Sequence, residues 1–276
     1  MQLPLRLMAG VSMKRFAAET PGGGAVTRYV RYEHGGRVAS GLLDGDTIRE
    51  LSASPFESGH PTGAQVALGD VRLLAPCTPS KVIAVGLNYK SHLQGRPEAG
   101  HPGIFIKLPT CIVGTGADVV LPEGAGNVHY EGEMVVVIGR RAKNVPQADA
   151  HAYVFGVTCG NDISERDWQK KDLQWFRAKA SDTFGPLGPA IVSGLDYRDL
   201  ALQTRVNGEL RQHARTSDLI FPVDEIVSFV TRFVTLEPGD VIYTGTPGTT
   251  QAMQPGDEVE VELEGVGVLR NRIAAA

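Results

Sequence analysis

The sequence predicts an α+β fold in which β-strands predominate. Glycine accounts for 33 of the 276 residues, well above its usual share of about 7%, and this excess indicates many turns. Short apolar and β-branched runs recur between turns, whereas the only clear long run with helical spacing follows Pro222. An apolar content of 42% suffices for one large domain with a small appendage.

Charge and cysteine content restrict the partners and the compartment. Lys and Arg total 27 against 31 Asp and Glu, a net charge of −4 without a basic tail. This balance argues against nucleic acid or an anionic membrane as partner, and it favours a small-molecule ligand. No apolar run approaches the length of a membrane span. Cys77, Cys111 and Cys159 lack CxxC spacing, so we expect neither a disulfide framework nor a zinc site, and a cytoplasmic location.

The N-terminal part predicts a small β-domain over residues 27–78. Residues 1–26 contain no convincing secretory cleavage site, and we expect them to form a flexible leader. Turns at His34-Gly35 and Asp44-Gly45 separate short apolar runs, as in a tight meander. A passage rich in Pro, Gly and Ser over 54–69 is expected to be a loop. The strands of this domain are predicted at 27–32, 36–43, 47–51 and 71–74.

The second domain, residues 79–276, begins with a buried strand over 82–86. The Gly- and Pro-rich segment from Asn88 to Gly103 follows, and we expect it to form a mobile lid. Pro222 opens the predicted helix, whose apolar face, including Phe233 and Val234, should pack on a sheet. Further strands are predicted at 103–107, 118–121, 131–138, 154–162, 240–244, 258–263 and 267–272, with a hairpin over 204–211 around Asn207-Gly208.

Two carboxylates stand at the start of the apolar run over 127–139. Because strand side chains alternate, Glu131 and Glu133 leave the same face, close enough to hold one ion. The other face carries Met134 and Ile138 and is predicted to pack in the hydrophobic core. Buried carboxylates without a partner destabilise a fold, so the pattern favours a bound cation. The alternative is an edge strand with solvated glutamates.

A third acid, Asp162, ends the apolar strand that begins near Val154. A helix is expected to open at Ser164, whose Ser-x-x-Asp spacing to Asp167 is that of a capping box. Asp162 would then stand at a strand-to-helix corner. Three oxygen ligands without His or Cys suit Mg²⁺ or Mn²⁺.

The chain lacks a GxSxG elbow, a phosphate loop and a Rossmann glycine motif. Six motifs occur in order along the chain: Gly86-Leu87-Asn88-Tyr89-x-x-His92, Phe105-Ile106-Lys107, Tyr130-Glu131-Gly132-Glu133, Asn161-Asp162-Ile163-Ser164-x-Arg166-Asp167, Lys179-x-x-Asp182 through Pro189, and Thr244-Gly245-Thr246-Pro247. With these motifs the chain, from Lys81 to its end, resembles the fumarylacetoacetate hydrolase superfamily. The N-terminal meander resembles that of bacterial 2-hydroxyhepta-2,4-diene-1,7-dioate isomerases.

The resemblance implies a mixed β-roll or barrel-like catalytic domain, a homodimer, and a Mg²⁺ or Mn²⁺ ion that binds a 2-oxo acid. Glu131, Glu133 and Asp162 match the three metal ligands of the family. His92 matches the base on the lid segment, since imidazole moves protons near neutral pH. Lys179 matches a lysine whose ammonium stabilises an enolate. A surface lysine is the alternative for Lys179.

The resemblance also assigns four residues to substrate binding. Gln169 matches a pocket glutamine, although a solvent-facing helix residue is nearly as good an interpretation. Thr246 matches a residue whose hydroxyl or backbone N–H meets a substrate carboxylate, although Gly-Thr-Pro is also ordinary turn composition. Gly245 and Lys107 complete the substrate-binding set.

The expected reaction is hydrolysis of a C–C bond through a metal-bound enolate. The substrate would be an acylpyruvate, fumarylpyruvate or a related intermediate of aromatic catabolism. Hydrolytic members often carry Glu three residues after the histidine, where this chain has Gly95, and Glu98 is the alternative acid. The departure weakens the case for hydrolysis. Isomerisation or decarboxylation of 2-hydroxyhepta-2,4-diene-1,7-dioate or oxaloacetate, and a catalytically inactive binding homologue, are the alternatives.

Overall fold

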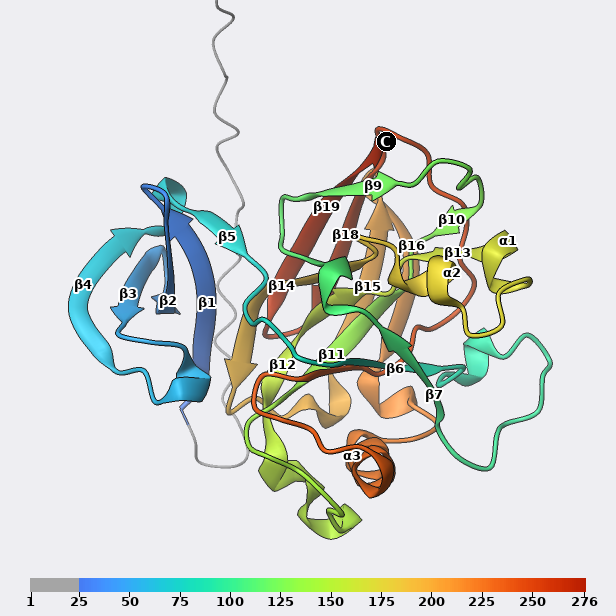
Figure 1. Ribbon diagram of the computed structural model, residues 1–276, viewed down its shortest axis with the longest axis horizontal. Helices are drawn as coiled ribbons and strands as arrows, with labels where there is room; N and C mark the ends of the chain where they lie inside the picture. The colour runs from blue at the N-terminus through green and yellow to red at the C-terminus, as the bar shows by residue number, and fades with distance from the viewer. Residues whose placement is uncertain (1–24) are drawn as a thin grey trace, which may run out of the picture.

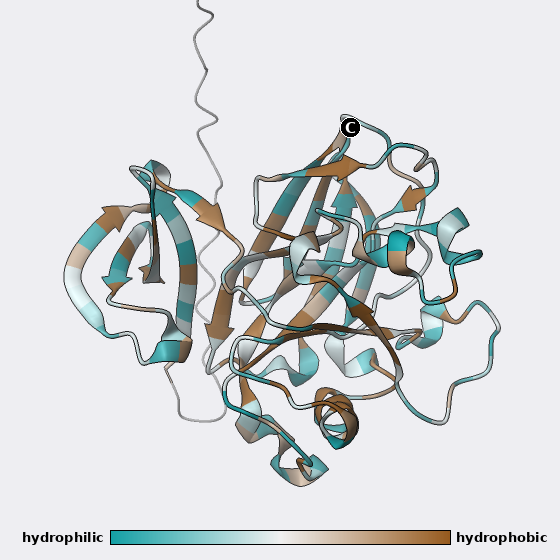
Figure 2. Cartoon of the chain, in the orientation of Figure 1, coloured by the Kyte–Doolittle hydropathy of each residue, from teal (hydrophilic) through white to brown (hydrophobic). Residues whose placement is uncertain are grey.

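The computed structural model describes residues 25–276 and confirms an α+β fold dominated by strands (Figure 1). The leader expected over 1–26 lies almost entirely outside the described residues. A long sheet has the strand order β4-β3-β2-β1-β14-β12-β11-β17-β6-β7, and a five-stranded sheet has the order β16-β15-β18-β19-β9. Hydrophobic residues concentrate along the central strands of the larger body (Figure 2).

The N-terminal meander forms as predicted and continues the long sheet. Strand β1 pairs with β2 on one side and with β14 of the larger body on the other. The loop expected over 54–69 contains a strand, β4, which the sequence missed because its side chains are mostly exposed and show no alternation. These strands are β1 Thr27–His34, β2 Arg37–Asp44, β3 Thr47–Leu51, β4 Pro61–Ala67 and β5 Arg72–Leu74.

The central strands of the long sheet are buried on both faces. Strand β14 was not predicted, because Pro186 and Pro189 argue against a central strand. The strands predicted at 82–86, 103–107 and 131–138 are confirmed to within one residue. The bounds in this part are β6 Val82–Gly86, β7 Gly103–Lys107, β8 Ile112–Val113, β11 Gly132–Ile138, β12 Val154–Asn161, β14 Gly185–Ser193 and β17 Val241–Tyr243.

The second sheet packs against the long sheet and encloses the main core. Met134 and Val136 of β11 contribute to the same hydrophobic cluster as Leu202 and Val261 of the second sheet. The predicted hairpin turn is confirmed, with positive φ at both central residues as a type I′ turn requires. The strands are β9 Asp118–Leu121, β15 Ala201–Val206, β16 Glu209–Arg215, β18 Glu258–Leu263 and β19 Gly267–Ala275.

Helix α3, Val223–Phe233, confirms the predicted helix and buries Ile226 and Val227 in the main core. The prediction was wrong at its end, because Phe233 is 68% exposed and Val234 has already left the helix with an extended backbone. The Phe233 ring packs on Phe229 outside the core, with 5.3 Å between ring centroids. No helix within residues 25–276 is long and apolar enough to cross a bilayer.

Two short helices, α1 Arg166–Gln169 and α2 Phe176–Ala180, follow β12. The helix expected to open at Ser164 opens two residues later. Ser164 belongs instead to β13, Ser164–Glu165, which pairs with β10, Val128–His129. Glu165 caps α1, since its carboxylate accepts a hydrogen bond from the Trp168 N–H at 2.5 Å. Pairing with β10 therefore overrides the capping pattern in the sequence.

Gly132 on β11 provides a test of this packing. A Cβ atom at Gly132 would overlap the side chain of Thr204 on β15. Gly132→Ala should lower the free energy of unfolding by about 1–3 kcal/mol, because the two sheets must separate to admit the methyl group. Denaturant unfolding measures the change. Gly126→Ala is the matched control, since a Cβ there meets nothing within 4 Å. Equal stability of the two variants would contradict the packing.

Candidate active site

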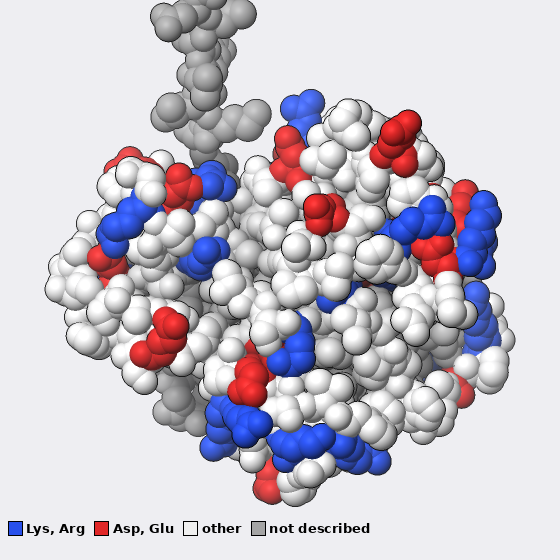
Figure 3. Space-filling model, viewed as in Figure 1, with Lys and Arg blue, Asp and Glu red and all other residues white. Residues whose placement is uncertain are grey.

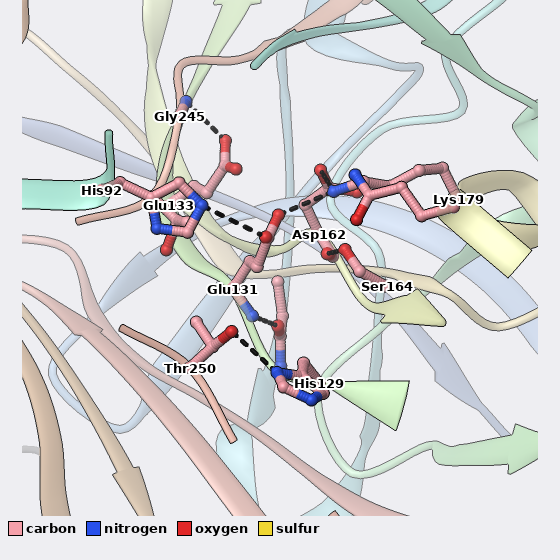
Figure 4. Close-up of polar contacts among 12 residues, drawn as sticks. His92, His129, Glu131, Glu133, Asp162, Ser164, Lys179, Gly245 and Thr250 are labelled. Atoms are coloured by element: carbon pink, nitrogen blue, oxygen red, sulfur yellow. Dashed lines mark hydrogen bonds and ion pairs between the residues drawn. The ribbon is translucent and has the colours of Figure 1, made fainter. Parts of the chain in front are cut away.

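Three carboxylates converge where β11 and β12 lie side by side. Glu131 precedes β11, Glu133 is its second residue, and Asp162 follows β12. Gly132 pairs with Asn161, and the Asp162 N–H donates to the Glu131 carbonyl at 2.8 Å. All three side chains are buried, and one oxygen from each lies within 4.8 Å of the others (Figure 4). The structure thus brings together the three acids that the sequence predicts as metal ligands.

Two buried lysines surround Asp162. The Lys179 ammonium on α2 donates to Glu131 Oε2 at 2.7 Å and to Asp162 Oδ2 at 2.6 Å. The Lys107 ammonium at the end of β7 donates to Asp162 Oδ1 at 2.8 Å and to the Lys179 carbonyl. Lys107 is fully buried and in this structure supports Asp162 and Lys179. Its role in substrate binding stays a prediction.

The carboxylates differ in their surroundings. Burial raises the pKa of Glu131, but the positive charges of Lys179 and Arg166 outweigh burial and hold it below its ordinary value. Burial and the charges of Asp162 and Glu131 raise the pKa of Glu133 well above its ordinary value. The Gly245 N–H donates to Glu133 Oε2 at 2.7 Å. Burial lowers the pKa of Lys179, but Asp162 and Glu131 raise it overall, so Lys179 remains an ammonium.

His92 faces the carboxylates. Its Nδ1 lies 2.5 Å from the Gly248 carbonyl, and its Nε2 lies 3.7 Å from Glu131 Oε1. Because a carbonyl only accepts hydrogen bonds, Nδ1 carries a hydrogen, and Nε2 is the ring nitrogen directed toward the site. The nearby Asn88 is buried and binds the Phe221 and Thr244 carbonyls, which fixes the start of this segment.

The segment predicted to form a mobile lid, from Asn88 to Gly103, is buried at its start. Asn88 and Leu93 are buried, whereas the stretch over 94–101 is exposed. Gly95, three residues after His92, has a φ of +84° and lies in open space. Glu98 pairs with Lys90 at 3.1 Å on the surface. In this structure, therefore, neither position places an acid beside His92.

The Gly245-Thr246 turn is fixed by Gln212 from the second sheet. The Gln212 amide donates to Thr246 Oγ1 at 2.8 Å and to the Pro247 carbonyl, and it accepts from the Gly132 N–H. The Thr246 hydroxyl in turn donates to the Gly132 carbonyl at 2.9 Å. The hydroxyl is thus committed, and the Thr246 N–H has no partner within residues 25–276. Sequence reasoning missed Gln212, because nothing near it in the chain marks a site.

Arg166 at the start of α1 connects Glu131 to Gln169. Its NH2 group donates to Glu131 Oε1 and to Thr250 Oγ1, and its NH1 group donates to Gln169 Oε1 at 2.9 Å. The motif that contains Arg166 predicts no role for it, although the i, i+3 spacing to Gln169 places both residues on one helix face. Burial and the Arg166 charge lower the pKa of the neighbouring His129 to about 4, which keeps its ring neutral.

Comparison with known proteins agrees with this geometry. Residues 81–274 match the fumarylacetoacetate (FAA) hydrolase C-terminal family. The chain belongs to the fumarylacetoacetate hydrolase family. Residues 27–76 match the Rv2993c-like N-terminal family. This family contains isomerases and hydrolases of small acids, and the all-oxygen group of Glu131, Glu133 and Asp162 is able to hold a metal ion.

Three members of the fumarylacetoacetate hydrolase family illustrate the similarity. Protein Rv2993c of Mycobacterium tuberculosis is 46% identical over 249 residues, 86% of this chain and 94% of that protein. Bovine mitochondrial oxaloacetate tautomerase FAHD2B is 43% identical over 219 residues, 74% of this chain and 70% of that protein. The crystal structure of 5-carboxymethyl-2-hydroxymuconate delta-isomerase from Mycobacterium smegmatis has a TM-score of 0.86 at 45% identity, covering 90% of this chain and 100% of that chain.

The role of Lys107 is open to a stability test. Lys107→Met keeps the length of the side chain but removes a buried charge that is bonded to Asp162. We expect the free energy of unfolding to fall by about 1.5–3 kcal/mol, because Asp162 loses one of its two ammonium partners and keeps only Lys179. Lys90→Met is the control, since the Lys90–Glu98 pair is exposed and contributes little. Similar denaturation midpoints for both variants would show that Lys107 does not support the acid cluster.

Proposed function

We propose that the protein is a divalent-metal-dependent enzyme that interconverts the keto and enol forms of a small 2-oxo dicarboxylic acid. The observation that carries this proposal is the placement of His92, which approaches the carboxylate group through Nε2 while Glu98 pairs with Lys90. Tautomerisation requires one group that moves a proton and a means of stabilising negative charge on oxygen. His92 and Lys179 meet these two requirements.

Glu131, Glu133 and Asp162 would hold Mg²⁺ or Mn²⁺. Their oxygens are close together and buried, and burial together with the charges of Asp162 and Glu131 raises the pKa of Glu133. Hard divalent ions prefer such carboxylate oxygens. A bound ion would act as a Lewis acid that polarises the 2-oxo group and orients the substrate.

In the proposed reaction His92 Nε2 takes a proton from the carbon next to the 2-oxo group. The electron pair of that C–H bond moves to the carbonyl oxygen, and the charged ammonium of Lys179 stabilises the negative charge that develops there. His92 then passes the proton it carries to that oxygen, which gives the enol and leaves the imidazole neutral again. In the reverse direction His92 returns the proton to carbon.

The names of two relatives support proton transfer. FAHD2B, 43% identical, is an oxaloacetate tautomerase, and the M. smegmatis protein, 45% identical, is an isomerase. Hydrolysis of a C–C bond is the second candidate, favoured by the shared carboxylate group, but it also requires an activated water. Gly95 supplies no acid for that purpose, and Glu98 would have to leave Lys90. Decarboxylation of oxaloacetate also needs no such water, because the bond between C3 and its carboxylate breaks in the keto form, CO₂ leaves, and the electron pair forms an enolate at the 2-oxo group.

The metal assignment predicts that binding and activity are lost together. Glu131→Gln and Asp162→Asn each remove one charge from the cluster, so both variants should purify without Mg²⁺ or Mn²⁺ and without turnover. Elemental analysis and activity assays of the same samples check this expectation. Glu98→Gln is the control, since Glu98 lies on the surface and should leave the metal content unchanged. Full metal content in Asp162→Asn would refute the assignment.

The reaction type is decided by rates on two substrates. His92→Ala should slow oxaloacetate tautomerisation by about 10²–10⁴-fold, the usual contribution of a general base. Glu98→Gln should be nearly silent on oxaloacetate and on an acylpyruvate, because Glu98 pairs with Lys90 away from His92. If Glu98→Gln instead depresses acylpyruvate hydrolysis as strongly as His92→Ala, a His92–Glu98 pair forms on closure and hydrolysis is the principal reaction. No turnover of either substrate by the wild type would favour a binding protein.

We also propose a homodimer in the cytoplasm. Strand β7 is the last strand of the long sheet and exposes Ile106 by 62%, while Phe176 on the adjoining α2 is 63% exposed. Figure 3 shows an uncharged surface where β7 lies in Figure 1. A second copy packed there by two-fold symmetry would cover both side chains. The three cysteines are free and buried, which supports a reducing compartment.

Light scattering tests the dimer. We expect the wild type to run as a dimer at micromolar concentration, and Ile106→Glu to run as a monomer because each copy would bury an unpaired charge. Leu210→Glu is the control, since Leu210 is exposed on β16 of the other sheet and should leave the dimer intact. A monomeric wild type would show that no dimer forms. A dimeric Ile106→Glu variant would show that the interface does not include Ile106.

A further inference from the structure

A chain of hydrogen bonds runs from the molecular surface to Arg166. Asn127 Nδ2 donates to Asp167 Oδ1 at 3.2 Å, and Asn127 Oδ1 lies 2.8 Å from His129 Nε2. His129 Nδ1 lies 2.9 Å from Thr250 Oγ1, which accepts from Arg166 NH2 at 2.8 Å. His129 and Thr250 lie beside the three carboxylates, on the side away from Lys179 (Figure 4).

The side chains in this series of hydrogen bonds allow only one assignment of donors and acceptors. The Asp167 carboxylate accepts, so the Asn127 amide must turn its NH₂ toward Asp167 and its oxygen toward His129. That oxygen accepts in turn, so His129 carries its hydrogen on Nε2 and offers the lone pair of Nδ1. The Thr250 hydroxyl therefore donates to His129 and keeps its oxygen free to accept from Arg166. Each link fixes the orientation of the next.

The arrangement of donors and acceptors extends beyond Arg166 to Gln169. Because Arg166 NH1 occupies Gln169 Oε1, the Gln169 amide is held with its NH₂ group free, and that group has no partner within residues 25–276. The Thr246 N–H also has no partner in the described part of the chain. These groups are all donors, so they suit a ligand with several acceptor oxygens.

We propose that Asn127, His129 and Thr250 are positioning residues that lock Arg166, and through it turn the Gln169 amide N–H₂ toward the second carboxylate of a dicarboxylic substrate. This proposal rests on the proposed 2-oxo dicarboxylic acid as substrate and adds how its far end is recognised. A substrate with a single carboxylate would not use this donor. The chain therefore contributes to selectivity between the two kinds of acid, and it does so from outside the pocket.

Thr250 offers a matched pair of variants. Thr250→Val keeps the shape of the side chain but removes the hydroxyl, which leaves Arg166 and His129 unconnected. Thr250→Ser retains the hydroxyl. Calorimetry on Mn²⁺-loaded protein would measure the dissociation constants of two probes. The first is 3,3-difluorooxaloacetate, a dicarboxylate that cannot enolise. The second is pyruvate, which has one carboxylate. We expect Thr250→Val to weaken binding of the dicarboxylate by about tenfold and binding of pyruvate by less than twofold. Thr250→Ser should bind both probes nearly as tightly as the wild type.

Asn127→Ala provides a second measurement at the far end of the chain, where only the Asp167 and His129 links are lost. This variant should weaken binding of the dicarboxylate by about twofold to fivefold, again with little effect on the binding of pyruvate. Three outcomes would overturn the proposal. The variants could lose equal affinity for both probes, Thr250→Ser could bind the dicarboxylate as weakly as Thr250→Val, or the wild type could show no preference for the dicarboxylate. Because these are binding measurements, they remain informative if the wild type proves inactive as a tautomerase.

Discussion

Three buried carboxylates of like charge impose the constraint on which the rest of the site depends. The pairing of β11 with β12 forces Glu131 and Asp162 together, and strand alternation adds Glu133. Such a group is unstable unless cations offset it. The chain supplies Lys107 from β7 and Lys179 from α2, and both bond directly to the acids. The fold thus assembles the positive groups from elements that are far apart in sequence around one negative centre.

This arrangement explains why a mostly sheet protein carries irregular backbone around its site. Helices α1 and α2 are only four and five residues long, yet they deliver Arg166 and Lys179 to the acids. The turn at Gly245 brings a backbone N–H to Glu133, and Gln212 fixes that turn from the opposite sheet. Strands supply the rigid frame, and the short segments between them supply the charges.

The sequence predicts the features that depend on local periodicity. Strands with alternating apolar residues, the Asn207-Gly208 hairpin and the body of α3 were all found at the expected positions. Strand β14 was missed because tertiary pairing on both sides overrides its prolines, and Ser164 was misassigned because pairing with β10 outweighs a capping pattern. The i, i+2 glutamates and Asp162 were identified as a group. The burial of Lys107 and the contacts of Gln212 depend on distant strands and leave no local signal.

The pairing of β1 with β14 has a consequence for how this chain is put together. The regions that match the N-terminal and C-terminal families meet along a shared ladder, at Thr27 to Tyr29 and Ile191 to Ser193. Removal of residues 27–76 would leave that part of β14 with unpaired N–H and C=O groups at an open sheet edge, which invites pairing with another chain. The small N-terminal region therefore covers a sheet edge of the larger one, and we expect an excised C-terminal region to aggregate unless another segment pairs with this edge.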